Sequence, residues 1–86
     1  MIRIIYADNT SARMRWTDQH ADSSYGLGVL LYARSSDLLD GEGFRALADQ
    51  GARIECDDDR ERRRVAGALA WPALGLSDDK LAIRVG

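Results

Sequence analysis

The feature that most constrains the fold is a two-residue periodicity in two stretches near the start of the chain. In MIRIIYA every second residue from Ile2 is apolar or aromatic, and in ARMRWT arginine alternates with methionine and tryptophan. A period of two residues is typical of β-strands with one buried face. Because the intervening DNTS consists of turn-forming residues, we expect these strands to pair as a β-hairpin.

The register of this hairpin decides which side chains share a face. Pairing Met14 and Trp16 with the apolar residues of the first strand leaves three arginines together on the opposite face: Arg3, Arg13 and Arg15. Other registers would mix the two faces and reduce burial. Like charges that face each other across strands destabilise a sheet, so this face requires nearby acidic side chains or an anionic partner. The acidic middle of the chain, nucleic acid, an acidic protein or a second copy of the chain could meet that requirement.

The remaining sequence predicts three more strands and two helices. The nearly continuous apolar run GLGVLLYAR predicts a strand in the middle of a sheet, and ARIEC and DKLAIRVG predict two short ones. GEGFRALADQG predicts a short helix that ends where Gly51 can take a left-handed conformation. A second helix follows ARIEC and ends before Pro72, the only proline in the chain.

Together these elements predict an α+β fold with an N-terminal β-hairpin followed by β-α-β-α-β. We expect one mixed sheet of four to five strands with two helices on one of its faces. The 86 residues fit a single compact domain over residues 1–86, and no linker or repeat divides them. With 45% hydrophobic and 30% charged residues, the chain has the composition of an ordinary globular domain.

The octet DDDRERRR combines features of a helix start with a concentration of charge. Asp58 is a preferred N-cap residue, and Glu61 is spaced to reach back to the amide of the cap, as in a capping box. Asp59 precedes Arg62 and Arg63 at the spacing of helical ion pairs. The octet is therefore primarily interpreted as the beginning of a helix.

A helical wheel of this segment places Val65 and Leu69 on a buried stripe. Three arginines and an indole fall within an arc of about 80° on the other side: Arg60, Arg63, Arg64 and Trp71. Such a cluster can bind phosphates or acidic side chains through charge-assisted hydrogen bonds and stacking. Because the four acids of the octet balance its four arginines, the case for nucleic acid is weakened.

Catalytic, cofactor and metal signatures are not apparent in this sequence. GEGFRA matches the glycine pattern of dinucleotide sites, but six residues separate it from the preceding strand, and Glu42 would place a negative charge beside the pyrophosphate. The carboxylates lack the spacing of a calcium loop. With His20 and Cys56 as the only histidine and cysteine, one chain cannot build a tetrahedral zinc site. We expect Cys56 to be a small buried residue, His20 to be solvated, and the protein not to be an enzyme.

The sequence also predicts a cytoplasmic protein without a membrane-spanning helix. The N-terminal stretch is not apolar enough for a signal peptide. Residues 23–33 form the longest run without a charge or side-chain amide, and they are too few to cross a bilayer. A single cysteine cannot form an intramolecular disulfide, which is consistent with a reducing compartment.

The net charge of −2 is unevenly distributed along the chain. Residues 1–17 hold three arginines and one aspartate, residues 18–59 three arginines and ten acids, and residues 60–86 six bases and three acids. Segregated charge governs association. In the absence of catalytic groups, it predicts a small cytoplasmic protein-interaction module. The acidic stretch from Asp37 through Asp59 could imitate a phosphate backbone or bind a basic groove, and the arginine clusters could bind an acidic surface.

In size and composition alone, the chain is comparable to compact inhibitors of nucleic-acid-handling complexes, including phage-encoded anti-restriction and anti-CRISPR proteins. The candidate partner-binding residues are Arg3, Arg13, Arg15, Asp57, Asp58, Asp59, Arg60, Arg63, Arg64 and Trp71. The alternative function is direct nucleic-acid binding, through Arg13, Arg15 and Trp16 or through the cluster of the second helix. The sequence is compatible with a monomer and with a homodimer.

Overall fold

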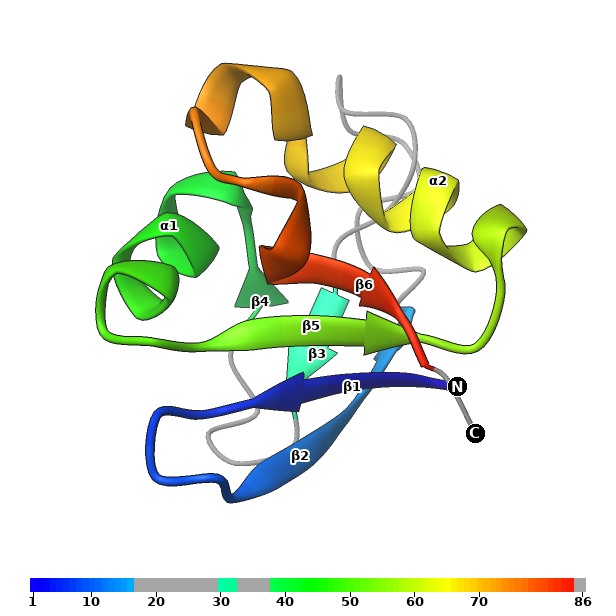
Figure 1. Ribbon diagram of the computed structural model, residues 1–86. Helices are drawn as coiled ribbons and strands as arrows, with labels where there is room; N and C mark the ends of the chain where they lie inside the picture. Colours follow the sequence, from blue (N-terminus) through cyan, green and yellow to red (C-terminus); the bar gives the residue numbers. More distant parts are fainter. Residues whose placement is uncertain (17–29, 33–37, 85–86) are drawn as a thin grey trace.

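The computed structural model describes residues 1–16, 30–32 and 38–84 and folds them into one mixed sheet with two helices (Figure 1). The strands run in the order β4-β3-β2-β1-β5-β6 across the sheet. The predicted α+β class, with an N-terminal hairpin and a mixed sheet, is confirmed. The elements are β1 (Ile2–Ile5), β2 (Ser11–Trp16), β3 (Leu30–Tyr32), β4 (Leu38–Leu39), α1 (Gly41–Asp49), β5 (Arg53–Cys56), α2 (Asp59–Leu69) and β6 (Leu81–Ile83), with two 3-10 turns at Trp71–Leu74 and Asp78–Lys80.

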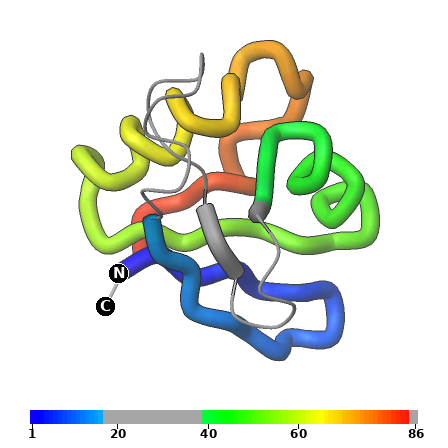
Figure 2. Tube along the Cα trace, turned by 180° about the vertical axis from the view of Figure 1, so that it is seen from behind, coloured from blue at the N-terminus to red at the C-terminus, as the bar shows by residue number. Residues whose placement is uncertain are grey.

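The hairpin of β1 and β2 has the register that the alternation predicts. Ile2 lies opposite Met14 and Arg3 opposite Arg13, so apolar and charged residues are sorted to opposite faces. In the turn, Asn9 adopts a positive φ of 67°, a conformation that asparagine tolerates better than most residues. In the view from behind, the hairpin turn and the N-terminus lie on opposite sides of the molecule (Figure 2).

The centre of the sheet is formed by β1, which pairs antiparallel with both β2 and β5. The prediction that the apolar run of residues 26–34 occupies the centre is wrong for its described part, because β3 is second from the edge. Connections explain the order: β2, β3 and β4 form an antiparallel meander on one side of β1. The segments containing α1 and α2 carry the chain to the other side, where β5 and β6 pair in parallel.

One short strand, β4, lies in a stretch that the sequence presents as a loop. It consists of Leu38 and Leu39, which pair with Leu31 and Leu30 of β3. Two consecutive leucines are too short to reveal a period of two residues. Leu39 is nevertheless buried in the core, so β4 anchors the start of α1 to the sheet.

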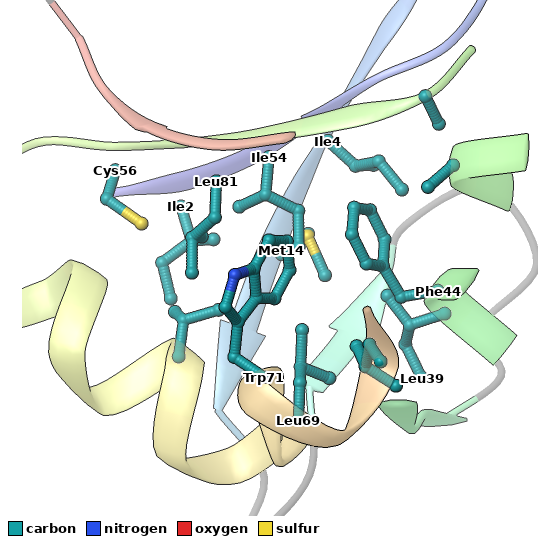
Figure 3. Close-up of a cluster of buried hydrophobic side chains, with 14 residues drawn as sticks. Ile2, Ile4, Met14, Leu39, Phe44, Ile54, Cys56, Leu69, Trp71 and Leu81 are labelled. Carbon is teal, nitrogen blue, oxygen red and sulfur yellow. The ribbon is translucent and has the colours of Figure 1, made fainter. Parts of the chain in front are cut away.

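Both helices cover the same face of the sheet, and the core lies between them and the strands (Figures 1 and 3). Phe44 from α1 and Trp71 from the first 3-10 turn meet at a ring-centroid distance of 5.7 Å. Side chains from β1, β2, β5 and β6 point into the same space, as Figure 3 shows. The buried cluster comprises Ile2, Ile4, Met14, Leu39, Phe44, Ala48, Ala52, Ile54, Cys56, Val65, Leu69, Trp71, Leu74 and Leu81.

The glycines of GEGFRA have structural roles at the beginning of α1. Asp40 caps this helix by accepting a hydrogen bond from the Gly43 amide at 2.7 Å. A Cβ on Gly41 would lie 2.4 Å from the Leu69 carbonyl oxygen, so the start of α1 contacts the end of α2 through backbone atoms. At the other end, Gly51 has the positive φ predicted for it, 104°. Close packing and turn geometry therefore account for these glycines.

Candidate functional site

The face of the sheet opposite the helices carries four arginines in the described residues. We call it the arginine face, and its members are Arg3, Arg13, Arg15 and Arg53. Alternation along β1, β2 and β5 places these side chains on the side away from the core. Arg13 and Arg15 are exposed, while Arg3 and Arg53 are half-buried. The predicted grouping of Arg3, Arg13 and Arg15 is therefore present, and Arg53 joins them from β5.

Carboxylates on this face are few. Arg3 lies directly between Arg13 on β2 and Glu55 on β5. Glu55 is the only acidic residue within the described strands. None of the ion pairs in the part of the chain that the structure describes involves a residue of the arginine face. The described part of the acidic middle thus contributes one strand carboxylate to this face, and within the described residues the cross-strand arginine pair keeps its like-charge repulsion.

The acids of the octet are instead used at the start of α2. Asp57 and Glu61 both bind the Met1 ammonium, Glu61 at 3.2 Å. Asp58 is the N-cap, as predicted, and accepts from the Glu61 amide at 2.8 Å. The reverse bond differs from the predicted capping box: the Glu61 carboxylate accepts from the Asp57 amide at 2.9 Å, one residue before the cap.

The contact between Met1 and Asp57 shifts the pKa of both groups. The hydrogen bond from the Met1 ammonium lowers the pKa of the exposed Asp57 carboxyl below its ordinary value. The same contact raises the pKa of the Met1 ammonium. Among the described acids, Asp40 and Asp58 therefore cap the two helices, and Asp57 pairs with the N-terminal ammonium.

The four arginines of α2 are engaged differently. Arg63 forms the predicted ion pair with Asp59, at 2.8 Å. Arg62 does not pair with Asp59; its Nε donates to the Leu81 carbonyl at 2.9 Å and ties α2 to the edge strand β6. Arg60 and Arg64 form no ion pair within the described residues.

Trp71 is not part of a surface cluster, so its predicted place beside the arginines of α2 is wrong. It is 8% exposed and packs against Phe44 in the core. The helical wheel fails because Ala70 adopts a left-handed conformation, with φ and ψ of 52°, and ends α2 at Leu69. The chain then enters a 3-10 turn that directs Trp71 inward (Figure 3).

A different indole, that of Trp16, lies beside the α2 arginines. The Arg64 guanidinium carbon lies 4.0 Å from the centre of the Trp16 ring. Around this contact is a cleft of about 320 Å³, lined by Trp16, Asp58, Arg60, Glu61 and Arg64, which we call the Trp16 cleft. It lies on the helix side of the sheet. Arg13 and Arg15 therefore face away from it, and the predicted cluster of these arginines with Trp16 is divided between two faces.

The sequence did not reveal the Trp16 cleft because its members are far apart along the chain. The available signal was the alternation in β2, which turns Trp16 toward the core face that α2 covers. The wheel of α2 correctly placed Arg60 and Arg64 together but assigned them the wrong indole. Only the packing of α2 across the sheet brings Arg64 to Trp16.

The remaining candidate groups are accounted for as follows. Cys56 is fully buried, as predicted, and burial raises the pKa of its thiol to about 12. His20 and Asp37 lie outside the described residues. Within the described ranges, no three residues of the types His, Cys, Asp and Glu come together as a possible metal-binding group. None of the helices in these ranges combines the length and apolar character needed to cross a membrane.

Comparison with protein-family models, curated proteins and solved structures finds no significant match to this chain.

Proposed function

We propose that this protein is a protein-interaction module that binds an acidic protein surface through its arginine face. The observation that carries the proposal is the presence of four guanidinium groups on one sheet face, with Glu55 as the only carboxylate on the described strands. A partner's carboxylates would relieve the repulsion between Arg3 and Arg13. Each would also form charge-assisted hydrogen bonds, bidentate where the geometry allows.

An acidic protein suits this face better than a nucleic acid does. The described part of the arginine face comes from β1, β2 and β5, and its side chains include no aromatic ring on which a base could stack. The protein also has a net charge of −2, which opposes the long-range attraction that phosphate backbones exert on basic proteins. Short-range recognition of carboxylates by arginine is less dependent on net charge.

The biological role that we propose is inhibition, by this contact, of a nucleic-acid-handling protein complex in the cytoplasm. The small size of the domain supports this role, as does the concentration on one face of arginines without ion pairs in the described part of the chain. The buried free thiol of Cys56 is compatible with a reducing compartment.

Affinity capture from the native host, with a pair of matched variants, tests the binding face. The double variant Arg13→Glu/Arg15→Glu reverses two exposed charges on the arginine face. Arg45→Glu/Lys80→Glu makes the same change in net charge away from it, on α1 and the second 3-10 turn. We expect a partner protein that wild type and the control retain equally and that the face variant retains at least about tenfold less, because two charged contacts are lost.

Nuclease treatment before capture separates the two classes of partner. Retention of the partner protein after treatment is expected if the contact is between proteins. A partner that disappears with the nucleic acid, or one that both variants retain equally, would refute binding of an acidic protein at this face. Circular dichroism of both variants verifies that each is folded.

A further inference from the structure

We propose that the Trp16 cleft is a second binding site, separate from the arginine face, that takes a nucleoside monophosphate unit. The cleft lies between the end of β2 and the first turns of α2. Its volume of about 320 Å³ is at the lower end of the usual range for small-molecule sites. The chemical class of the ligand follows from the three kinds of group that line it.

The first group is a stacking surface. Trp16 is half-buried at the edge of the core, which restrains its ring, and the Arg64 guanidinium lies over that ring at 4.0 Å. Indole rings and planar guanidinium groups both stack on nucleobases, and base stacking on an aromatic side chain contributes about 1–3 kcal/mol. A carboxylate or an isolated phosphate could pair with the Arg64 guanidinium but has no ring to stack on this surface.

The second group is a cation, Arg60, that has no ion pair with any residue the structure describes. Arg60 lies one helical turn before Arg64, on the same side of α2, and both line the cleft. The two intervening arginines are already engaged, Arg62 with a β6 carbonyl and Arg63 with Asp59. Arg60 therefore remains available for a phosphate oxygen through a charge-assisted hydrogen bond.

The third group consists of the carboxylates of Asp58 and Glu61. Each already accepts a backbone amide in the α2 cap, and Glu61 also accepts the Met1 ammonium. A carboxylate has about four lone-pair positions, so acceptor capacity remains for ribose hydroxyls or exocyclic amino groups of a base. The two carboxylates repel any anion, a phosphate included, but a glutamate-rich peptide also lacks the aromatic ring that would stack on the first group. Only a ligand that combines an anion, an aromatic ring and hydrogen-bond donors matches all three groups.

The cleft can be observed directly because the chain contains only two tryptophans. In a Trp71→Phe background, Trp16 is the sole indole. This change should be tolerated, because the buried Trp71 Nε1 has no hydrogen-bond partner within the described residues. We would titrate this variant with adenosine monophosphate, adenosine, inorganic phosphate, a short oligoadenylate and a glutamate-rich peptide, and record Trp16 fluorescence. The indole N–H signal of Trp16 in a nitrogen-edited NMR spectrum of the wild type provides the same readout should the variant not fold.

We expect saturable changes at Trp16 with adenosine monophosphate or the oligonucleotide, and at least about tenfold weaker binding after Arg64→Gln or Arg60→Gln. Arg63→Gln is the matched control on the same helix and should leave the affinity unchanged. Equal affinity for the monophosphate and the oligonucleotide would identify the natural ligand as a free nucleotide. Tighter binding of the oligonucleotide would identify it as a nucleotide unit within a single strand.

The other outcomes would overturn the proposal. They are no change at Trp16 with either nucleotide probe up to about 1 mM, equal responses to inorganic phosphate or the acidic peptide, and equal loss of affinity in the Arg63→Gln control. Loss of the arginine face by Arg13→Glu/Arg15→Glu should leave nucleotide affinity intact. Failure of one proposed site can therefore be distinguished from failure of the other.

Discussion

The four arginines of α2 have different surroundings although they lie within five residues of one another. Arg62 donates a hydrogen bond to the edge strand β6, and Arg63 forms an ion pair on the helix surface. The Arg64 guanidinium lies over the ring of Trp16. Arg60 lines the same cleft without an ion pair in the described part of the chain. Replacement of the first two should therefore affect mainly the structure, and replacement of Arg60 and Arg64 mainly binding.

Cys56 provides a prediction at this scale, because burial raises the pKa of its thiol from 9.0 to about 12. The folded state then keeps the proton while the unfolded state loses it above about pH 9. This contribution to stability is complete below pH 9 and is lost as the pH rises toward 12, by at most about 1.4 kcal/mol per pH unit. Urea unfolding of wild type and Cys56→Ala between pH 8 and about pH 10.5 should show the steeper loss of stability in the wild type.

The Met1 ammonium, whose pKa is also raised, loses its favourable ion pairs over the alkaline range in both proteins, so its effect cancels in this comparison. Parallel pH profiles would show that the thiol is not protected by burial. A complementary measurement is reaction of Cys56 with a disulfide reagent at pH 8, which should be slow in the folded protein and rapid in urea, since only the thiolate reacts.

At the scale of elements, the sequence predicts best where one local pattern decides the structure. The alternation in β1 and β2 predicted both the hairpin and its arginine face, and Asp58 predicted the start of α2. Local patterns failed where a single backbone conformation redirects the chain. Ala70 in a left-handed conformation moves Trp71 from the predicted surface into the core. Alanine has no preference for the left-handed conformation, so the sequence gives no sign that the chain turns at Ala70.

The contact between the start of α1 and the end of α2 provides a second prediction. Gly41 and Gly43 both lie in the first turn of α1, so alanine should improve helix propensity similarly at either position, by up to about 1 kcal/mol. A Cβ on Gly41, however, would lie 2.4 Å from the backbone oxygen of Leu69, whereas one on Gly43 would meet the side-chain oxygen of Asp40 at 3.1 Å. We expect Gly41→Ala to lower the free energy of unfolding by about 1–3 kcal/mol. Gly43→Ala should cost clearly less in the same urea titration.

Equal effects of the two alanines would mean that α1 can move away from α2 without loss. That result would contradict the view that the glycine pattern of GEGFRA is required by close backbone packing. A larger loss at Gly43 would point to the Asp40 cap as the more sensitive contact, because the Cβ there approaches the capping carboxylate.

At the scale of the whole molecule, the same sheet separates two surfaces of different chemistry. The helix side carries the core and the Trp16 cleft, and the other side carries the arginine face. The sequence predicted the arginine face because it depends on neighbouring strands of one hairpin. It could not predict the Trp16 cleft, because the meeting of Trp16 with Arg64 depends on the order of strands and the packing of α2.

Repulsion between the cross-strand arginines of the arginine face should lower the stability of the fold. Arg13 lies directly opposite Arg3, so Arg13→Glu replaces a repulsive cross-strand pair with an attractive one. We expect the free energy of unfolding to rise by about 0.2–1 kcal/mol. The gain should shrink as salt is added, because exposed charges are screened. Arg45→Glu on α1 changes the net charge equally without facing an arginine across a strand and serves as the control.

Urea titrations of the three proteins at low and high ionic strength measure this effect, and the capture experiment measures its functional consequence. If Arg13→Glu stabilises the fold and, tested alone in the same capture experiment, also weakens retention of the partner, the wild-type arginine pair favours binding at the expense of stability. If Arg13→Glu were destabilising at low salt while Arg45→Glu was neutral, Arg13 would have a favourable contact within the fold. The arginine face would then not be free to bind an acidic partner.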